Sequence, residues 1–205
     1  MLPIQLTTLR LRNPSLFRLL ATALAASGCK AYQLPTNAMG PTLLAGDYLL
    51  AIELIDPPAQ GEIVIYQTHG AVYVKRVVGL PGDTLSMHRG ELFLDGRSVS
   101  EPYVTRKAAT EVVDSAFGWQ RRFLVGRARI EAYHPTSMTW GPILVPSGSY
   151  FILGDNRPES ADSRYTGFVS GDSIIERPFL IYFSYDRNAK AVRWNQIGTS
   201  IKRTP

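Results

Sequence analysis

Lys75 is the residue whose setting in this sequence most suggests chemistry, because it stands within an apolar, β-branched run from Val72 to Val78. A lysine can take a proton from a hydroxyl nucleophile only when its amine is neutral. Burial among apolar side chains lowers the pKa of an ammonium and so favours that neutral form. If the run is a strand, alternation places Tyr73, Lys75 and Val77 on one face, which suits desolvation. On residue type alone, a lysine that protects an edge strand from aggregation is the commoner interpretation.

Two other segments carry polar side chains that could complete such a site. The first, residues 35–47, offers hydroxyl groups at Thr36 and Thr42, each directly after a proline that stiffens the backbone. The second, residues 154–164, is dense in aspartate, asparagine and serine. By composition alone, the second segment fits an ordinary surface turn.

The sequence has no pattern of metal ligands. Its histidines are scattered, and it has one cysteine, Cys29. Metal sites in proteins need several such residues at regular short spacings. We therefore expect no metal and no cofactor, and one cysteine excludes an intrachain disulfide.

Positive charge is concentrated near the N-terminus. The chain has 205 residues and a net charge of +5, with 45% hydrophobic and 19% charged residues, as in globular proteins. Residues 1–31 contain no acid and four basic residues, namely Arg10, Arg12, Arg18 and Lys30. The rest of the chain carries 18 basic and 17 acidic residues and is nearly neutral. This distribution favours a membrane-facing flank over a nucleic-acid surface.

Residues 1–31 are expected to form a membrane-targeting segment, and three interpretations of it remain open. Its apolar run, Leu19–Gly28, is about half of the roughly 20 residues that a spanning helix needs. It could be a short or tilted anchor with its basic residues on the cytoplasmic side. It could be a secretory signal peptide, in which the residues before Cys29 resemble a lipoprotein cleavage box and Cys29 becomes lipidated. It could also be an amphipathic helix packed on the body, with Cys29 unmodified.

The body of the chain reads as short strands separated by turns. The pattern predicts a strand over 47–54 and a hairpin whose strands, 63–66 and 72–78, flank a turn at 68–70. It predicts a second hairpin over 91–99 with Asp95-Gly96 at its turn. Later strands are expected at 150–153 and over 174–183, where Pro178 indicates an edge or a bend.

These elements predict a mostly β protein, built as a sandwich or partly open barrel. Residues 32–100 and 141–205 are expected to form the core. Residues 101–140, which have a mixed pattern, are expected to form an inserted β-rich subdomain.

The Lys75 run and residues 35–47 and 154–164 together resemble the type I signal peptidases, the membrane-bound Ser/Lys endopeptidases that remove signal peptides from exported proteins. The resemblance covers most of the body. It is carried by Gly154-Asp155-Asn156-Arg157 with Ser160-Ala161-Asp162-Ser163-Arg164, by Val74–Asp83, and by the ending Val192–Gly198. We expect the fold of that family, a β-rich catalytic core with an insertion.

The resemblance assigns a catalytic role to the Lys75 strand and to residues 35–47. Lys75 falls on the general base of the family. The family's nucleophile is a serine directly before Met39, where this chain has Ala38. Thr36 falls on the hydroxyl residue that forms the oxyanion hole with the backbone N–H of the nucleophile. Asn37 departs from the small residue usual between them.

The resemblance implies that residues 154–164 support the general base. Ser160 corresponds to the serine that hydrogen-bonds the lysine and orients it. The other matched positions correspond to a buried polar scaffold, namely Asp155, Asn156, Arg157, Asp162 and Arg164. We expect Asp162 and Arg164 to pair, because burying either charge alone would cost several kcal/mol.

The resemblance also implies a partner and a location. Members of the family bind the signal peptide of a preprotein as an extended strand, with small residues at the first and third positions before the cut. The matched pocket walls are Leu34, Pro35, Met39, Tyr73 and Val74. The membrane lipid surface is a second expected partner, with Trp194 helping the body to sit on it. We expect a bacterial cytoplasmic membrane protein whose body lies on the extracytoplasmic side and binds no nucleic acid.

Ala38 has no nucleophilic atom, and three accounts of it are considered. The first is an inactivating Ser→Ala change in an otherwise active peptidase. The second is a natural homologue that binds signal peptides or partners without cutting them. The third is rescue by the hydroxyl of Thr36 or Thr42, which would need a different backbone geometry. Self-cleaving Ser/Lys transcription regulators have a similar catalytic body, but no helix-turn-helix pattern precedes it in this sequence.

Overall fold

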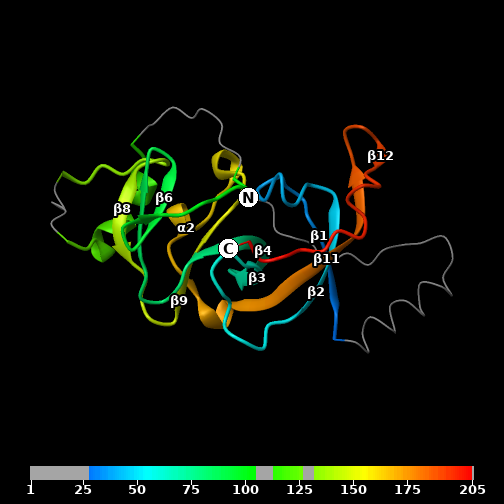
Figure 1. Ribbon diagram of the computed structural model, residues 1–205, viewed down its shortest axis with the longest axis horizontal. Coiled ribbons are helices and arrows are strands. Elements are labelled where there is room, and N and C mark those ends of the chain that lie inside the picture. The colour runs from blue at the N-terminus through cyan, green and yellow to red at the C-terminus, as the bar shows by residue number, and fades with distance from the viewer. Residues whose placement is uncertain (1–27, 105–112, 127–131, 205) are drawn as a thin grey trace.

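The computed structural model describes residues 28–104, 113–126 and 132–204, which form two antiparallel sheets (Figure 1). The larger sheet has the order β1-β2-β11-β3-β4-β9-β10, and β12 pairs with β11. Its strands are β1 (Lys30–Gln33), β2 (Asp47–Glu53), β3 (Ile63–Thr68), β4 (Ala71–Gly79), β9 (Ser149–Leu153), β10 (Val169–Ser170), β11 (Ile174–Asp186) and β12 (Ala191–Val192). The mostly β fold expected from the sequence is confirmed.

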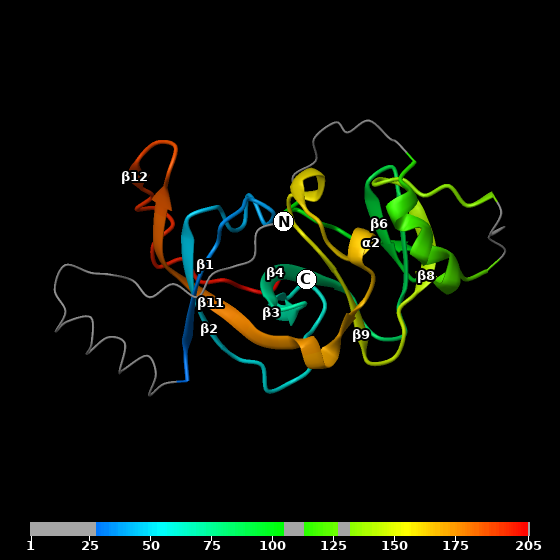
Figure 2. The same ribbon diagram turned by 180° about the vertical axis from the view of Figure 1, so that it is seen from behind.

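The smaller sheet has the order β7-β6-β5-β8 and lies beside the larger one (Figure 2). Its strands are β5 (Thr84–His88), β6 (Glu91–Leu94), β7 (Arg97–Ser98) and β8 (Trp140–Leu144). It therefore takes strands from both sides of residues 101–140, the range expected to be the insertion. Short helices complete the fold, namely η1 (Ser115–Phe123), η3 (Arg157–Glu159), α2 (Ser163–Thr166) and η4 (Gly171–Ser173).

The expected hairpins are present, and their turns explain why they form. His69 and Gly70 both have positive φ at the β3–β4 turn, as do Asp95 and Gly96 at the β6–β7 turn. Two successive residues with positive φ give the turn whose twist matches paired strands. Both expected hairpins are confirmed by the strand pairing.

Strand β11 shows how the sheet accommodates Pro178. The last pair between β11 and β3 is at Glu176, and the register against β2 shifts between Pro178 and Leu180. Pro178 has no N–H to donate. It lies past the last β3 pair, so the sheet loses no ladder bond on that side. The sequence predicts an edge or a bend at Pro178, and the β11–β2 ladder shifts its register directly after this residue.

The N-terminal interpretations concern residues that lie almost entirely outside the described part of the chain, which begins at residue 28. Within the described ranges, no helix has the length and apolar character needed to cross a bilayer. From Lys30 onward the chain is β1, whose Lys30 pairs with Ala51 in β2.

Candidate active site

Lys75 is held near the middle of β4, and its side chain is 2% exposed. Burial lowers the pKa of its ammonium to about 8, although the nearby Asp162 and Asp155 carboxylates oppose this shift. Its Nζ donates a hydrogen bond to the carbonyl oxygen of Val74 at 3.1 Å. A substantial neutral fraction is therefore available at mildly alkaline pH.

Ala38 lies in the loop between β1 and β2, residues 34–46, which is called the Ala38 loop below. Hydrogen bonds close this loop at its ends. Leu34 N donates to Asp47 O at 2.9 Å, and Gly46 N donates to Leu34 O at 2.8 Å. Within the loop, Ala45 N donates to Asn37 Oδ1 at 2.8 Å. Ala38 is 6% exposed and presents a methyl group where the hydroxymethyl group of a serine would stand.

Gly154 lies where the segment that contains Ser160 packs against the loop that contains Ala38. A Cβ atom at this position would lie 2.2 Å from Ser160 Oγ and 2.4 Å from Ala38 O. In the β4–β9 ladder Arg76 pairs with Leu153, and this register continued by one residue sets Lys75 opposite Gly154. Ala38 O and Ser160 Oγ are therefore packed against a glycine that no side chain could replace without displacing one of them, and the buried Lys75 lies on the adjacent strand β4.

Ser160 is buried, but the hydrogen bond from it to Lys75 that the resemblance implies is not formed. Lys75 Nζ donates to Val74 O instead, and among the described residues Ser160 Oγ is buried without a hydrogen-bond partner. Burial alone would raise the pKa of Asp162, but the Arg164 guanidinium and the hydrogen bond from Gly154 N hold it below its ordinary value. The expected pairing of Asp162 with Arg164 is confirmed, with Nε to Oδ1 at 2.8 Å and Nη2 to Oδ2 at 2.9 Å.

Arg76, for which the sequence suggested no role, stabilises the Ala38 loop through Asp155. Its guanidinium donates to both oxygens of Asp155, at 2.8 and 2.7 Å. Asp155 Oδ2 also accepts from the hydroxyl of Thr42, at 2.5 Å. A buried ion pair thus fixes the segment that follows Ala38. A charged residue beside Lys75 in an apolar strand was the one sequence signal for it.

The remaining scaffold residues hold residues 154–160 in place. Asn156 N donates to Ala38 O at 3.2 Å, and Asn156 Nδ2 donates to Asn37 O at 3.1 Å. Arg157 Nε donates to Gly154 O at 3.0 Å, and its Nη2 forms an ion pair with the buried Glu101. Glu101 is a further residue that sequence reasoning missed.

The residues expected to form the substrate pocket do not all lie together. Leu34, Met39 and Val74 are buried in one apolar cluster beside β1. Tyr73 belongs to a different cluster, where its ring lies 5.4 Å from that of Tyr66. Pro35 is on the opposite side of the loop, where it lines a separate cleft. Thr36 is half-buried in the same loop.

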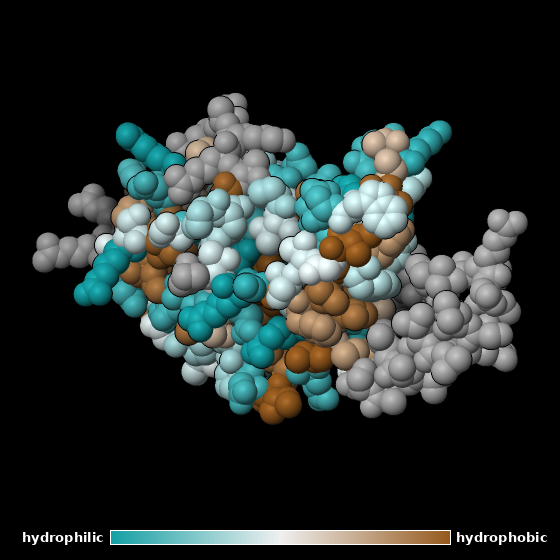
Figure 3. Space-filling view, turned by 45° about the vertical axis from the view of Figure 1, so that its right-hand side comes forward, coloured by the Kyte–Doolittle hydropathy of each residue, from teal (hydrophilic) through white to brown (hydrophobic). Residues whose placement is uncertain are grey.

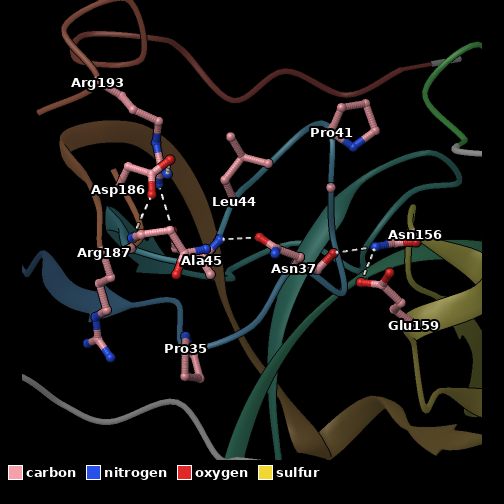
Figure 4. Close-up of a pocket in the computed structure, with 13 residues that line it drawn as sticks. Pro35, Asn37, Pro41, Leu44, Ala45, Asn156, Glu159, Asp186, Arg187 and Arg193 are labelled. Atoms are coloured by element: carbon pink, nitrogen blue, oxygen red, sulfur yellow. Dashed lines mark hydrogen bonds and ion pairs between the residues drawn. The ribbon is translucent and has the colours of Figure 1, made fainter. Parts of the chain in front are cut away.

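That cleft has a volume of about 590 Å³ and lies on the outer side of the Ala38 loop (Figure 4). One wall is formed by Asn156 and Glu159, and the opposite wall by the turn between β11 and β12. Arg193 ties this turn to the loop, because its Nη2 donates to Ala45 O at 2.6 Å. Within the described residues, no group of three or more histidine, cysteine, aspartate or glutamate side chains could hold a metal ion.

Comparison with known proteins identifies the family of this chain. Residues 14–183 match the family model described as signal peptidase, peptidase S26. The chain belongs to this family. It is 32% identical over 163 residues to signal peptidase I of Bacillus amyloliquefaciens, covering 78% of each chain. It is 27% identical over 180 residues to a probable signal peptidase I-2 of Synechocystis, covering 82% of this chain and 70% of that one.

Among solved structures, the chain is similar to the crystal structure of a signal peptidase I from Enterococcus faecalis V583. The two are 32% identical and superpose with a TM-score of 0.40, over 59% of this chain and 96% of the other. Membership of the signal peptidase family makes preproteins that carry signal peptides the substrate class of its relatives. It also places this chain among hydrolases that act in protein secretion.

Proposed function

We propose that this chain binds signal peptides of exported preproteins as extended strands and does not cleave them while position 38 is alanine. The observation that carries the proposal is the packing at Gly154, where Ala38 O and Ser160 Oγ crowd the glycine while the buried Lys75 lies on the adjacent strand β4. The alanine side chain supplies no nucleophilic oxygen for acyl-enzyme chemistry. Loss of the nucleophile from such a unit leaves only residual catalysis.

Rescue by a threonine is disfavoured by the hydrogen bonds around it. The Thr42 hydroxyl donates to Asp155 at 2.5 Å, and Asp155 is in turn held by Arg76. Activating Thr42 would require Lys75 to take a hydroxyl proton that is already donated in the hydrogen bond to the Asp155 carboxylate. Thr36 keeps its proposed role as an oxyanion donor, which is worth about 10² to 10³ in rate in comparable sites.

We further propose that the body sits on the extracytoplasmic face of a bacterial cytoplasmic membrane. Hydrophobic residues gather in places on the face shown in Figure 3, between hydrophilic ones. Among the described residues, Ile55 is 91% exposed and Trp194 is 76% exposed. Apolar side chains of this kind insert into the headgroup region of a bilayer.

The test compares the Ala38 protein with its Ala38→Ser variant, using a preprotein that has Ala-x-Ala before its cut site. We expect cleavage only by the serine variant, increasing with pH around a midpoint near 8 as Lys75 loses its proton. The double variant Ala38→Ser, Lys75→Met is the control and should be inactive. Cleavage by the Ala38 protein would refute the proposal.

A second candidate function is that of a natural non-catalytic homologue. Such a chain would bind signal peptides or partners and would not cleave them even with serine at position 38. A serine variant that captures the preprotein but leaves it intact would favour this candidate. The retained burial of Lys75 argues against it, because a binding surface gains nothing from a desolvated lysine.

A further inference from the structure

Residues 101–104, which follow β7 in the smaller sheet, contact the charged residues that hold the Ala38 loop. The chain is anchored to the smaller sheet just before them, because Val99 N donates to Leu92 O at 2.9 Å. The Val99 side chain also packs against the apolar cluster that contains Leu92. Glu101 is nevertheless only 5% exposed. A buried carboxylate in a connecting segment indicates that the segment does more than join two parts of the chain.

The ring of Tyr103 covers the guanidinium of Arg76. The Arg76 Cζ atom lies 3.8 Å from the centroid of this ring, and Arg76 is buried. The N–H donors of a guanidinium lie in its plane, so hydrogen bonds cannot satisfy its flat faces. In that plane Arg76 donates to both oxygens of Asp155 and to Gly61 O, at 2.7 to 2.8 Å. Tyr103 therefore adds a cation–π contact and keeps water from one face of the buried ion pair.

Glu101 holds a second arginine. Its Oε1 forms an ion pair with Arg157 Nη2 and accepts a long hydrogen bond from the Tyr103 hydroxyl, at 3.4 Å. Arg157 in turn donates from Nε to Gly154 O at 3.0 Å. Since Gly154 and Asp155 are consecutive, Glu101 and Tyr103 act through two arginines on one short stretch of backbone.

We infer that Glu101 and Tyr103 are positioning residues for the Ala38 loop, and that the smaller sheet holds this loop in place through them. The inference rests on the proposed function, in which the loop contributes to peptide binding. Asp155 carries the constraint to the loop, because its Oδ2 accepts a hydrogen bond from Thr42 at 2.5 Å. The links are buried charged groups, so the loss of one leaves its partner without compensation.

The test measures hydrogen exchange of backbone amides in the full Ala38 protein. The reporters are the amides of Leu43, Ala45 and Gly46, which donate hydrogen bonds within the loop. We expect Tyr103→Leu to speed their exchange by roughly 2- to 30-fold, the range that a cation–π contact spans. Tyr103→Phe keeps the ring over Arg76 and should restore the exchange rates of the parent protein.

Phe93→Leu is the matched control for the loss of a ring. Phe93 is a half-buried residue of β6, and among the described residues its ring covers no arginine. It should leave the exchange of the loop amides unchanged, even if it lowers the free energy of unfolding. Glu101→Gln keeps an oxygen acceptor for Arg157 but removes the charge. We expect this variant to speed exchange at Asn156 N, which donates to Ala38 O.

The same changes in the Ala38→Ser background test the effect on cleavage. We expect Tyr103→Leu to lower kcat/KM for a preprotein by about 10-fold or more, because a small displacement of a reacting group can cost about 10² in rate. Tyr103→Phe should rescue this loss, which a loss of general stability would not predict.

The two proposals fail in different ways. If the loop amides exchange equally fast in Tyr103→Leu and the parent, or if Tyr103→Phe or Phe93→Leu speeds them as much as Tyr103→Leu, the positioning role is overturned. The proposed function then stands on cleavage by the Ala38→Ser variant. If that variant cleaves nothing, the proposed catalytic chemistry fails, and the exchange rates still decide the positioning role.

Discussion

The cost of burying Lys75 gives a quantitative test of the reasoning about the site. Burial lowers the pKa of Lys75 from 10.5 to about 8. At about 1.4 kcal/mol per pKa unit, this shift corresponds to roughly 3 kcal/mol of lost stability when the amine is charged. Because the side chain is 2% exposed, solvent screening reduces this figure little. Lys75→Met removes the charge and keeps an unbranched side chain of similar length.

The pH range of the effect follows from the direction of the shift. Below about pH 8 the amine is protonated in both folded and unfolded chains, so the folded state bears the whole cost. Between about 8 and 10.5 the unfolded chain binds more protons at this site, and the free energy of unfolding rises with pH. Above 10.5 the amine is neutral in both states and the cost is gone.

We therefore expect Lys75→Met to be more stable than the parent protein at pH 7, by up to about 3 kcal/mol, with the difference closing toward pH 10.5. Urea denaturation of both proteins at pH 7, 8.5 and 10 measures it, and the difference between them cancels groups that titrate in both. Lys202→Met, at an exposed position, is the control and should show no such trend. A difference that stays constant or widens with pH would refute the account of a desolvated lysine.

Two further predictions concern the residues that hold the Ala38 loop. Asp155→Asn should lower the free energy of unfolding by about 3 to 5 kcal/mol in urea denaturation, because it leaves the Arg76 charge buried without its partner. Adding Arg76→Met should recover part of that loss, and a double variant as unstable as the sum of the two single ones would contradict the pairing. Gly154→Ala should destabilise the protein by about 1 to 3 kcal/mol and abolish any cleavage by the Ala38→Ser variant, because its Cβ would overlap Ser160 Oγ and Ala38 O. Gly118→Ala, whose nearest neighbour is the end of the Arg121 side chain at 3.6 Å, is the matched control, and equal effects at both positions would refute the close-packing argument.

Local sequence patterns determined the strands of this protein, because they depend on residues near one another in the chain. Alternating apolar residues, with turn residues at His69-Gly70 and Asp95-Gly96, predict both hairpins from local sequence. In the structure these turn residues have positive φ, as such turns require. Side-chain alternation along β4 likewise separates Tyr73 from Val74, which pack in different clusters. The missing hydroxyl at Ala38 is also evident from the sequence, since it depends on residue identity alone.

The tertiary structure alone decided how the polar residues are used, because their partners are far away in sequence. Arg76 and Asp155 are 79 residues apart, and Thr42 and Asp155 are 113 apart, so no local pattern pairs them. The smaller sheet joins strands from both sides of residues 101–140, because β5 pairs with β8. The packing of Ala38 O and Ser160 Oγ against Gly154 likewise joins residues far apart in sequence, next to the pairing of β4 with β9. The sequence identifies most of the candidate site residues, but only long-range strand pairing decides which of them pack together.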